Sequence, residues 1–178
     1  PDEVRDDVIY QIGALKGFCS LHGVRMQHVK PHGSLYNMCV GNEVLSRAVA
    51  EAIASVDPTL LWVVLGGAST ALSRKIADET GIRVVFEAFP DRAYAPDGRL
   101  ASRKLPGAVI GDPARAAEQA LRMARDGRVI ALDGTRLDME VHTLCVHGDN
   151  PSALHHVRTI RQALESEGIR ILPMGVSV

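Results

Sequence analysis

The sequence VKPHGSLYN at residues 29–37 places a cation, an imidazole, a glycine, a phenol and an amide within one short stretch. The residues before it, 24–29, alternate apolar and polar side chains, as a half-buried strand does. We expect the strand to end at Pro31, which cannot donate to a β-ladder, and Gly33 to permit a turn closed to other residues. The polar candidates that follow this strand are Lys30, His32 and Asn37.

Helices and strands are predicted to alternate along the rest of the chain. Apolar residues at three- and four-residue spacing predict helices over residues 1–18, 42–57, 69–79, 112–125 and 150–167. Val8, Ile12 and Leu15 share this spacing in the first helix, and Asn42 and Asp112 are expected to cap the helices that they begin. Apolar runs bounded by turn residues predict strands over residues 60–65, 82–86, 108–110, 144–146 and 169–172, and a hairpin over 128–141. Residues 90–104 form a long connection of the kind that often serves as a lid or binding loop. This alternation predicts an α/β fold with a mainly parallel sheet.

The composition bounds the class of protein. The 178 residues suit a single domain over 1–178. Hydrophobic residues make up 46% of the chain, which is enough for a core, and because aromatic residues make up only 4%, aliphatic side chains must build that core. A net charge of −1 argues against a nucleic-acid or anionic-membrane partner held by bulk charge. The three cysteines, Cys19, Cys39 and Cys145, form no CxxC pair, and we expect reduced thiols in a cytoplasmic protein.

Polar residues also follow other predicted strands. His147 and Asp149 flank a glycine after a buried strand, and an imidazole beside a carboxylate is a common general-base arrangement. Asp149 could instead cap the last helix, and His32, His147 and Asp149 could together hold a metal ion, so the metal content is left open. The adjacent His155 and His156 are expected to lie on the surface of that helix.

The third strand is followed by Glu87, Asp91, Arg92 and Tyr94. Arg92 could clamp a carboxylate or form a salt bridge with Asp91, and Lys30 could hold an anion or lie in solvent. The pair Gly66-Gly67 offers backbone N–H groups near a helix start, which is a weak anion-binding pattern. The sequence contains neither GxxxxGK[ST] nor GxSxG, so it carries no P-loop and no hydrolase elbow.

Four motifs resemble one known family in order and spacing: VKPHGSLYN at 29–37, FEAFPDRAY at 86–94, PGAVI at 106–110 and CVHGD at 145–149. The first closely resembles the VKPHGALYN motif of the LamB/YcsF family, whose characterised members are the A subunit of the ATP-hydrolysing 5-oxoprolinase. The departures are Ser34 in place of alanine and Pro90 before Asp91. Members of the family also carry an earlier segment with acidic and histidine motifs, which we expect this chain, opening at Pro1, to lack.

The resemblance implies a distorted parallel (β/α) barrel of the glycoside hydrolase/deacetylase type, here without its N-terminal strands. It also implies cleavage of the lactam 5-oxo-L-proline to L-glutamate with ATP, together with the B and C subunits of that enzyme. The expected catalytic residues are His32, His147 and Asp149. The residues expected to bind substrate or phosphate are Lys30, Asn37, Asp91, Arg92 and Tyr94. Two alternatives stay open: a metal-dependent amidase or deacetylase, and a non-catalytic subunit that binds the lactam.

Overall fold

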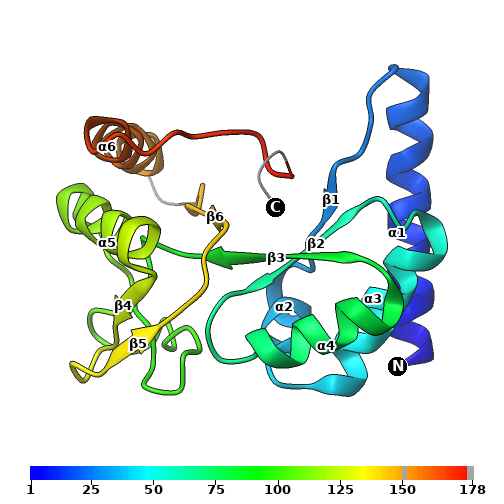
Figure 1. Cartoon of the computed structure of the whole chain (residues 1–178), viewed down its shortest axis with the longest axis horizontal. Coiled ribbons are helices and arrows are strands. Elements are labelled where there is room, and N and C mark those ends of the chain that lie inside the picture. The colour runs from blue at the N-terminus through cyan, green and yellow to red at the C-terminus, as the bar shows by residue number, and fades with distance from the viewer. Residues whose placement is uncertain (150–151, 176–178) are drawn as a thin grey trace. The chain divides into compact units, whose positions relative to one another are not determined.

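The computed structural model describes residues 1–149 and 152–175. They group into two compact units, one of Pro1–Leu65 and Ser69–Val85, the other of Gly66–Ala68 and Phe86–Val178. One sheet has the strand order β1-β2-β3-β6, and β4 and β5 form a separate hairpin (Figure 1). Helices and strands are interleaved along the chain, as the sequence predicts, except that α2 and α3 are consecutive helices and β4, β5 and β6 are consecutive strands.

The first unit contains the helices α1 (Asp2–Leu21), α2 (Gly33–Cys39), α3 (Glu43–Val56) and α4 (Thr70–Thr80), with strands β1 (His28–Val29) and β2 (Leu61–Leu65). Strands β1 and β2 pair in parallel, with His28 opposite Leu61. All of β2 is buried, which confirms the prediction made from its apolar run. The Asn42 side chain accepts a hydrogen bond from the Leu45 N–H at 3.2 Å, so the predicted cap of α3 is also confirmed.

Three expectations for this unit are wrong. The strand predicted from Val24 is assigned only at His28–Val29, where β2 provides a ladder, and Val24 is exposed. The sequence predicted no helix between the first strand and residue 42, but helix α2 begins at Gly33, whose φ of +63° suits the predicted turn. Leu15 was expected on the buried face of the first helix, but it is exposed, and Val8 and Ile12 are the residues of α1 that are buried.

The second unit contains α5 (Pro113–Asp126), β4 (Arg128–Ile130), β5 (Arg136–Asp138), β6 (Thr143–Leu144) and α6 (Ala153–Ser166). Strand β3 (Arg83–Ala88) begins in the first unit and ends in the second, where Glu87 and Ala88 pair in parallel with β6. The β4–β5 hairpin and the Asp112 cap of α5, which accepts from the Ala114 N–H at 3.0 Å, confirm two further predictions.

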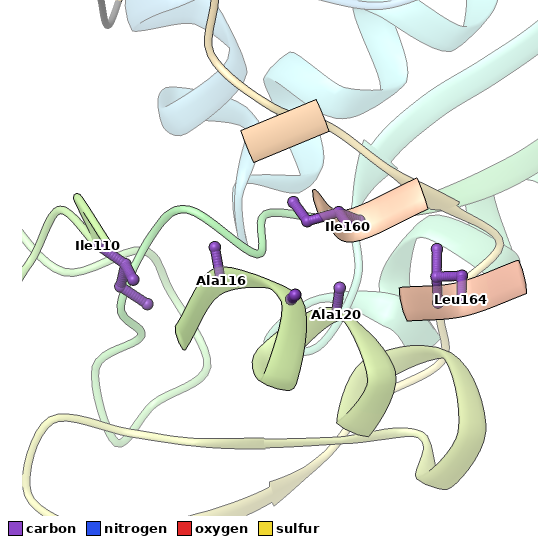
Figure 2. Close-up of a cluster of buried hydrophobic side chains, with 6 residues drawn as sticks. Ile110, Ala116, Ala120, Ile160 and Leu164 are labelled. Carbon is purple, nitrogen blue, oxygen red and sulfur yellow. The ribbon is translucent and has the colours of Figure 1, made fainter. Parts of the chain in front are cut away.

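The core of the second unit lies between α5 and α6 (Figure 2). Alanines on α5 face larger aliphatic side chains of α6, so the two helices can approach closely and still exclude water. The cluster consists of Ile110, Ala116, Ala117, Ala120, Ile160 and Leu164.

His156 is also buried in this unit, although the sequence had suggested a surface position. Its side chain is 0% exposed, with Nδ1 3.0 Å from the carbonyl oxygen of Ser152 and Nε2 3.1 Å from that of Ile110. Its neighbour His155 is exposed as expected. Neighbouring positions point in different directions on a helix, so the pair is divided between core and solvent.

Two short strands predicted in this unit are not formed. Val109 makes an isolated bridge with Arg92, and residues 169–172 have no strand assignment. An apolar run becomes a strand only where another strand provides ladder partners. Across the described residues, no helix has both the length and the apolar character needed to span a bilayer.

Candidate active site around Asp91 and His147

Asp91 and His147 lie 56 positions apart in sequence and are in direct contact within the second unit. Oδ2 of Asp91 is 2.8 Å from Nδ1 of His147 and also accepts a hydrogen bond from the His147 backbone N–H at 2.9 Å. An ionised carboxylate only accepts hydrogen bonds, so this contact favours the neutral His147 tautomer that carries its proton on Nδ1 and leaves a lone pair on Nε2. The arrangement of carboxylate and imidazole suits a general base.

The two partners differ in exposure. The Asp91 side chain is 5% exposed and that of His147 is 25% exposed, so the carboxylate is inside and the imidazole reaches the surface. The imidazole stacks on the ring of Phe89, with centroids 5.3 Å apart. Oδ1 of Asp91 is buried and has no hydrogen-bond partner within residues 1–149 and 152–175. A buried carboxylate with an unpaired oxygen is costly, and such groups are concentrated at functional sites.

The turn that carries Asp91 is held by Gln119 of α5, a residue that belongs to none of the sequence motifs. Nε2 of this buried side chain lies 3.3 Å, 3.1 Å and 2.7 Å from the backbone oxygens of Phe89, Pro90 and Arg92. The carbonyl of Asp91 accepts a further bond from the Ile110 N–H at 2.9 Å. The sequence did carry one signal for Gln119: it is a polar residue on the alanine-rich face of α5. Because a buried amide needs hydrogen-bond partners, such a position indicates a structural contact.

Arg92 and Tyr94 fasten the same segment from inside. The Arg92 guanidinium donates to the carbonyls of Ala108 at 3.2 Å and Ala101 at 2.7 Å, and burial lowers the pKa of Arg92. The fully buried Tyr94 hydroxyl accepts a hydrogen bond from the Phe89 N–H at 2.9 Å, and burial raises the pKa of Tyr94. These contacts tie residues 90–104 into the second unit by many internal hydrogen bonds. The residues predicted to bind substrate here are thus engaged with the protein backbone.

Asp149 lies in solvent beside Arg103, another residue outside the sequence motifs. Nη1 of Arg103 is 3.3 Å from Oδ2 of Asp149, and this hydrogen bond lowers the pKa of Asp149, with burial opposing it. The alternative role of Asp149 as a helix cap is wrong, because α6 begins at Ala153 with Ser152 in the cap position. The Asn150-Pro151 start predicted for this helix lies outside the described residues.

The remaining candidates belong to the first unit, after β1. Nζ of Lys30 lies 5.5 Å from the centroid of the Tyr36 ring, a cation–π distance. His32 occupies the exposed cap position of α2 with an extended backbone. Nδ2 of Asn37 donates to the Gly33 carbonyl at 3.1 Å, so this amide stabilises the first turn of α2.

The Gly66-Gly67 pair has a packing explanation. The Gly66 N–H donates to the Glu87 carbonyl at 2.8 Å, and a Cβ on Gly66 would lie 2.5 Å from the Glu140 carbonyl oxygen. Helix α4 begins later, at Thr70. Close backbone approach, rather than an anion, accounts for Gly66.

Potential metal ligands are scattered over the molecule. Over the part of the chain that the structure describes, no three His, Cys, Asp or Glu side chains gather closely enough to hold a metal ion. Cys19, Cys39 and Cys145 form no disulfide with one another.

The fold and the Asp91–His147 contact define an α/β protein with a carboxylate–imidazole pair just beyond a strand of its sheet. The model of the LamB/YcsF family matches residues 1–177, and the chain belongs to this family. Two relatives are named as the A subunit of 5-oxoprolinase: one from Syntrophobacter fumaroxidans is 46% identical and one from Pyrococcus furiosus is 49% identical. Each match covers 98% of this chain and 68% of the relative.

A solved structure is also similar. The crystal structure of the lactam utilization protein from Thermus thermophilus has a TM-score of 0.85 and 44% identity, over 96% of this chain and 67% of that one. This likeness confirms the predicted α/β fold of the barrel type, of which the strands β1-β2-β3-β6 form part.

Proposed function

We propose that this chain is the A subunit of an ATP-dependent 5-oxoprolinase, which cleaves 5-oxo-L-proline to L-glutamate together with its B and C subunits. The observation that carries the proposal is the contact between Asp91 and His147, which supplies an oriented base. The names of the relatives support the same reaction, since they describe one component of a 5-oxoprolinase. We place the reaction in the cytoplasm, where thiols such as those of the three cysteines, which form no disulfide with one another, stay reduced.

The chemistry explains why ATP and a base are both needed. An unstrained amide resists water, and phosphorylation of the lactam oxygen provides a leaving group. His147 takes a proton from water through Nε2, and the water oxygen bonds to the former carbonyl carbon. The ring C–N bond then breaks, the nitrogen takes the proton, and an acyl phosphate remains. A second water attacks this acyl phosphate, which releases phosphate and leaves the new carboxylate of glutamate. Asp91 holds the ring proton on Nδ1 and stabilises the imidazolium that forms. Because the sequence has no P-loop, we assign ATP binding to the complex with the partner subunits.

Residues of the first unit complete the proposal. His32 is proposed as a second catalytic group, and Lys30 and Asn37 as groups that bind the substrate or its phosphate. A cation stabilises the charge that develops on phosphoryl oxygens, which is the reason for including Lys30.

The test is release of glutamate by the reconstituted complex. Turnover should require ATP and all three subunits, and His147→Ala should lower kcat by about 10²–10⁴, the usual contribution of a general base. His155→Ala is the matched control, since this exposed imidazole on α6 lies outside the proposed site and its loss should leave wild-type turnover. Turnover that persists without ATP, or a His147→Ala complex as fast as wild type, would contradict the proposal.

A further inference from the structure

An exposed arginine at the end of the 90–104 segment forms an ion pair with Asp149, close in sequence to His147. Arg103 contacts Asp149, which follows His147 by two positions, through one nitrogen at 3.3 Å. The side chains are 52% and 66% exposed, respectively. Exposed ion pairs of this kind contribute little to stability, so an incoming anion can displace Asp149 at low cost.

Charges around Arg92 tie this ion pair to the site. Burial is the main cause of the lowered pKa of Arg92, and the positive charge of Arg103 lowers it further, while Asp91 and Asp149 oppose the change. These charged groups therefore lie within electrostatic reach of one another in the second unit. The negative charge of Asp149 is in turn stabilised by Arg103 first and by His147 to a smaller extent.

The two arginines have different tasks. Arg92 is 6% exposed and donates hydrogen bonds to the carbonyls of Ala108 and Ala101, so its guanidinium stabilises the backbone of the segment from inside. The Ala101 carbonyl that it fixes is two positions before Arg103. Arg92 thus anchors the segment, and the exposed guanidinium of Arg103 contacts Asp149, two positions after His147.

We propose that Arg103 binds the carboxylate of the lactam substrate in place of the carboxylate of Asp149. The inference rests on the proposed function and names the residue that recognises the anionic end of the substrate. A planar guanidinium matches a carboxylate through two parallel hydrogen bonds, which Lys cannot reproduce. The contact with Asp149 already shows this guanidinium donating a hydrogen bond to a carboxylate. The substrate class is a cyclic amide that bears a carboxylate.

A binding experiment tests Arg103 directly. Calorimetric titration of the complex compares 5-oxo-L-proline with 5-oxo-L-prolinamide, which has the same ring and a neutral amide in place of the carboxylate. The wild-type protein should prefer the acid by about 10- to 100-fold, as expected for a charge-assisted hydrogen bond, and Arg103→Gln should reduce this ratio to near one. Arg99→Gln is the matched control, because Arg99 is an exposed arginine of the same segment that pairs locally with Asp97 at 3.6 Å.

Kinetics separate a substrate carboxylate from a phosphate. Arg103→Gln should raise KM for 5-oxo-L-proline by a similar factor and leave KM for ATP unchanged. A rise in KM for ATP alone, an unchanged preference for the acid, or an equal loss in Arg99→Gln would overturn the assignment. A wild-type complex without turnover would refute the proposed function, while the acid-to-amide binding ratio would still decide whether Arg103 is an anion site.

Discussion

Replacing Gln119 by leucine should destabilise the protein and disturb the Asp91–His147 contact. The carboxamide has two N–H protons, and the backbone oxygens of Phe89, Pro90 and Arg92 lie within 3.3 Å of its nitrogen. At least two of these acceptors lose their partner in the variant. An unpaired buried acceptor costs about 1–3 kcal/mol, so we expect the free energy of unfolding to fall by about 2–6 kcal/mol. Leucine has a similar volume and a high helix propensity, so packing and helix formation contribute little to this loss.

Urea unfolding followed by circular dichroism measures the loss, and Glu118→Leu is the matched control on the preceding residue. Glu118 is exposed and pairs with Arg122 at 2.7 Å on the surface of α5, so its replacement should change stability by less than about 0.5 kcal/mol. The nitrogen chemical shifts of the His147 ring should also move in Gln119→Leu, because the turn that carries Asp91 loses its support. A Gln119→Leu protein with wild-type stability and an unchanged His147 spectrum would refute this account of the turn.

Two other predictions concern buried groups. His156→Ala should lower the free energy of unfolding by about 2–4 kcal/mol, because it removes a buried ring and its hydrogen bonds. In the same urea titration, replacement of the exposed neighbour, His155→Ala, should lower it by less than about 0.5 kcal/mol. Equal losses would contradict the burial of His156. Burial raises the pKa of the Cys39 thiol to about 11, so at pH 8 this thiol stays protonated and should resist iodoacetamide in the folded protein. Mass spectrometry should show the label only after unfolding or as the pH approaches that value. Rapid labelling of the folded protein at pH 8 would contradict the prediction, because it would show that the thiol is accessible.

The local features of this fold were readable in the sequence. Asn42 and Asp112 cap their helices as predicted, because a cap depends on a side chain and the N–H groups two or three residues later. The buried run of β2 and the turn at Gly33 were likewise predicted, since apolar patterning and positive φ are properties of a few consecutive residues.

Contacts between distant residues were decided by the tertiary structure. The sequence identified Asp91 and His147 as separate candidates, but only packing of the turn after β3 against the segment after β6 places their atoms 2.8 Å apart. Gln119 gave no motif, because its role depends on backbone carbonyls some thirty positions earlier. The apolar run 169–172 had the composition of a strand and did not become one, since a ladder requires a second chain segment. Short-range chemistry is encoded in neighbouring residues, whereas burial and long-range pairing depend on which elements the whole chain brings together.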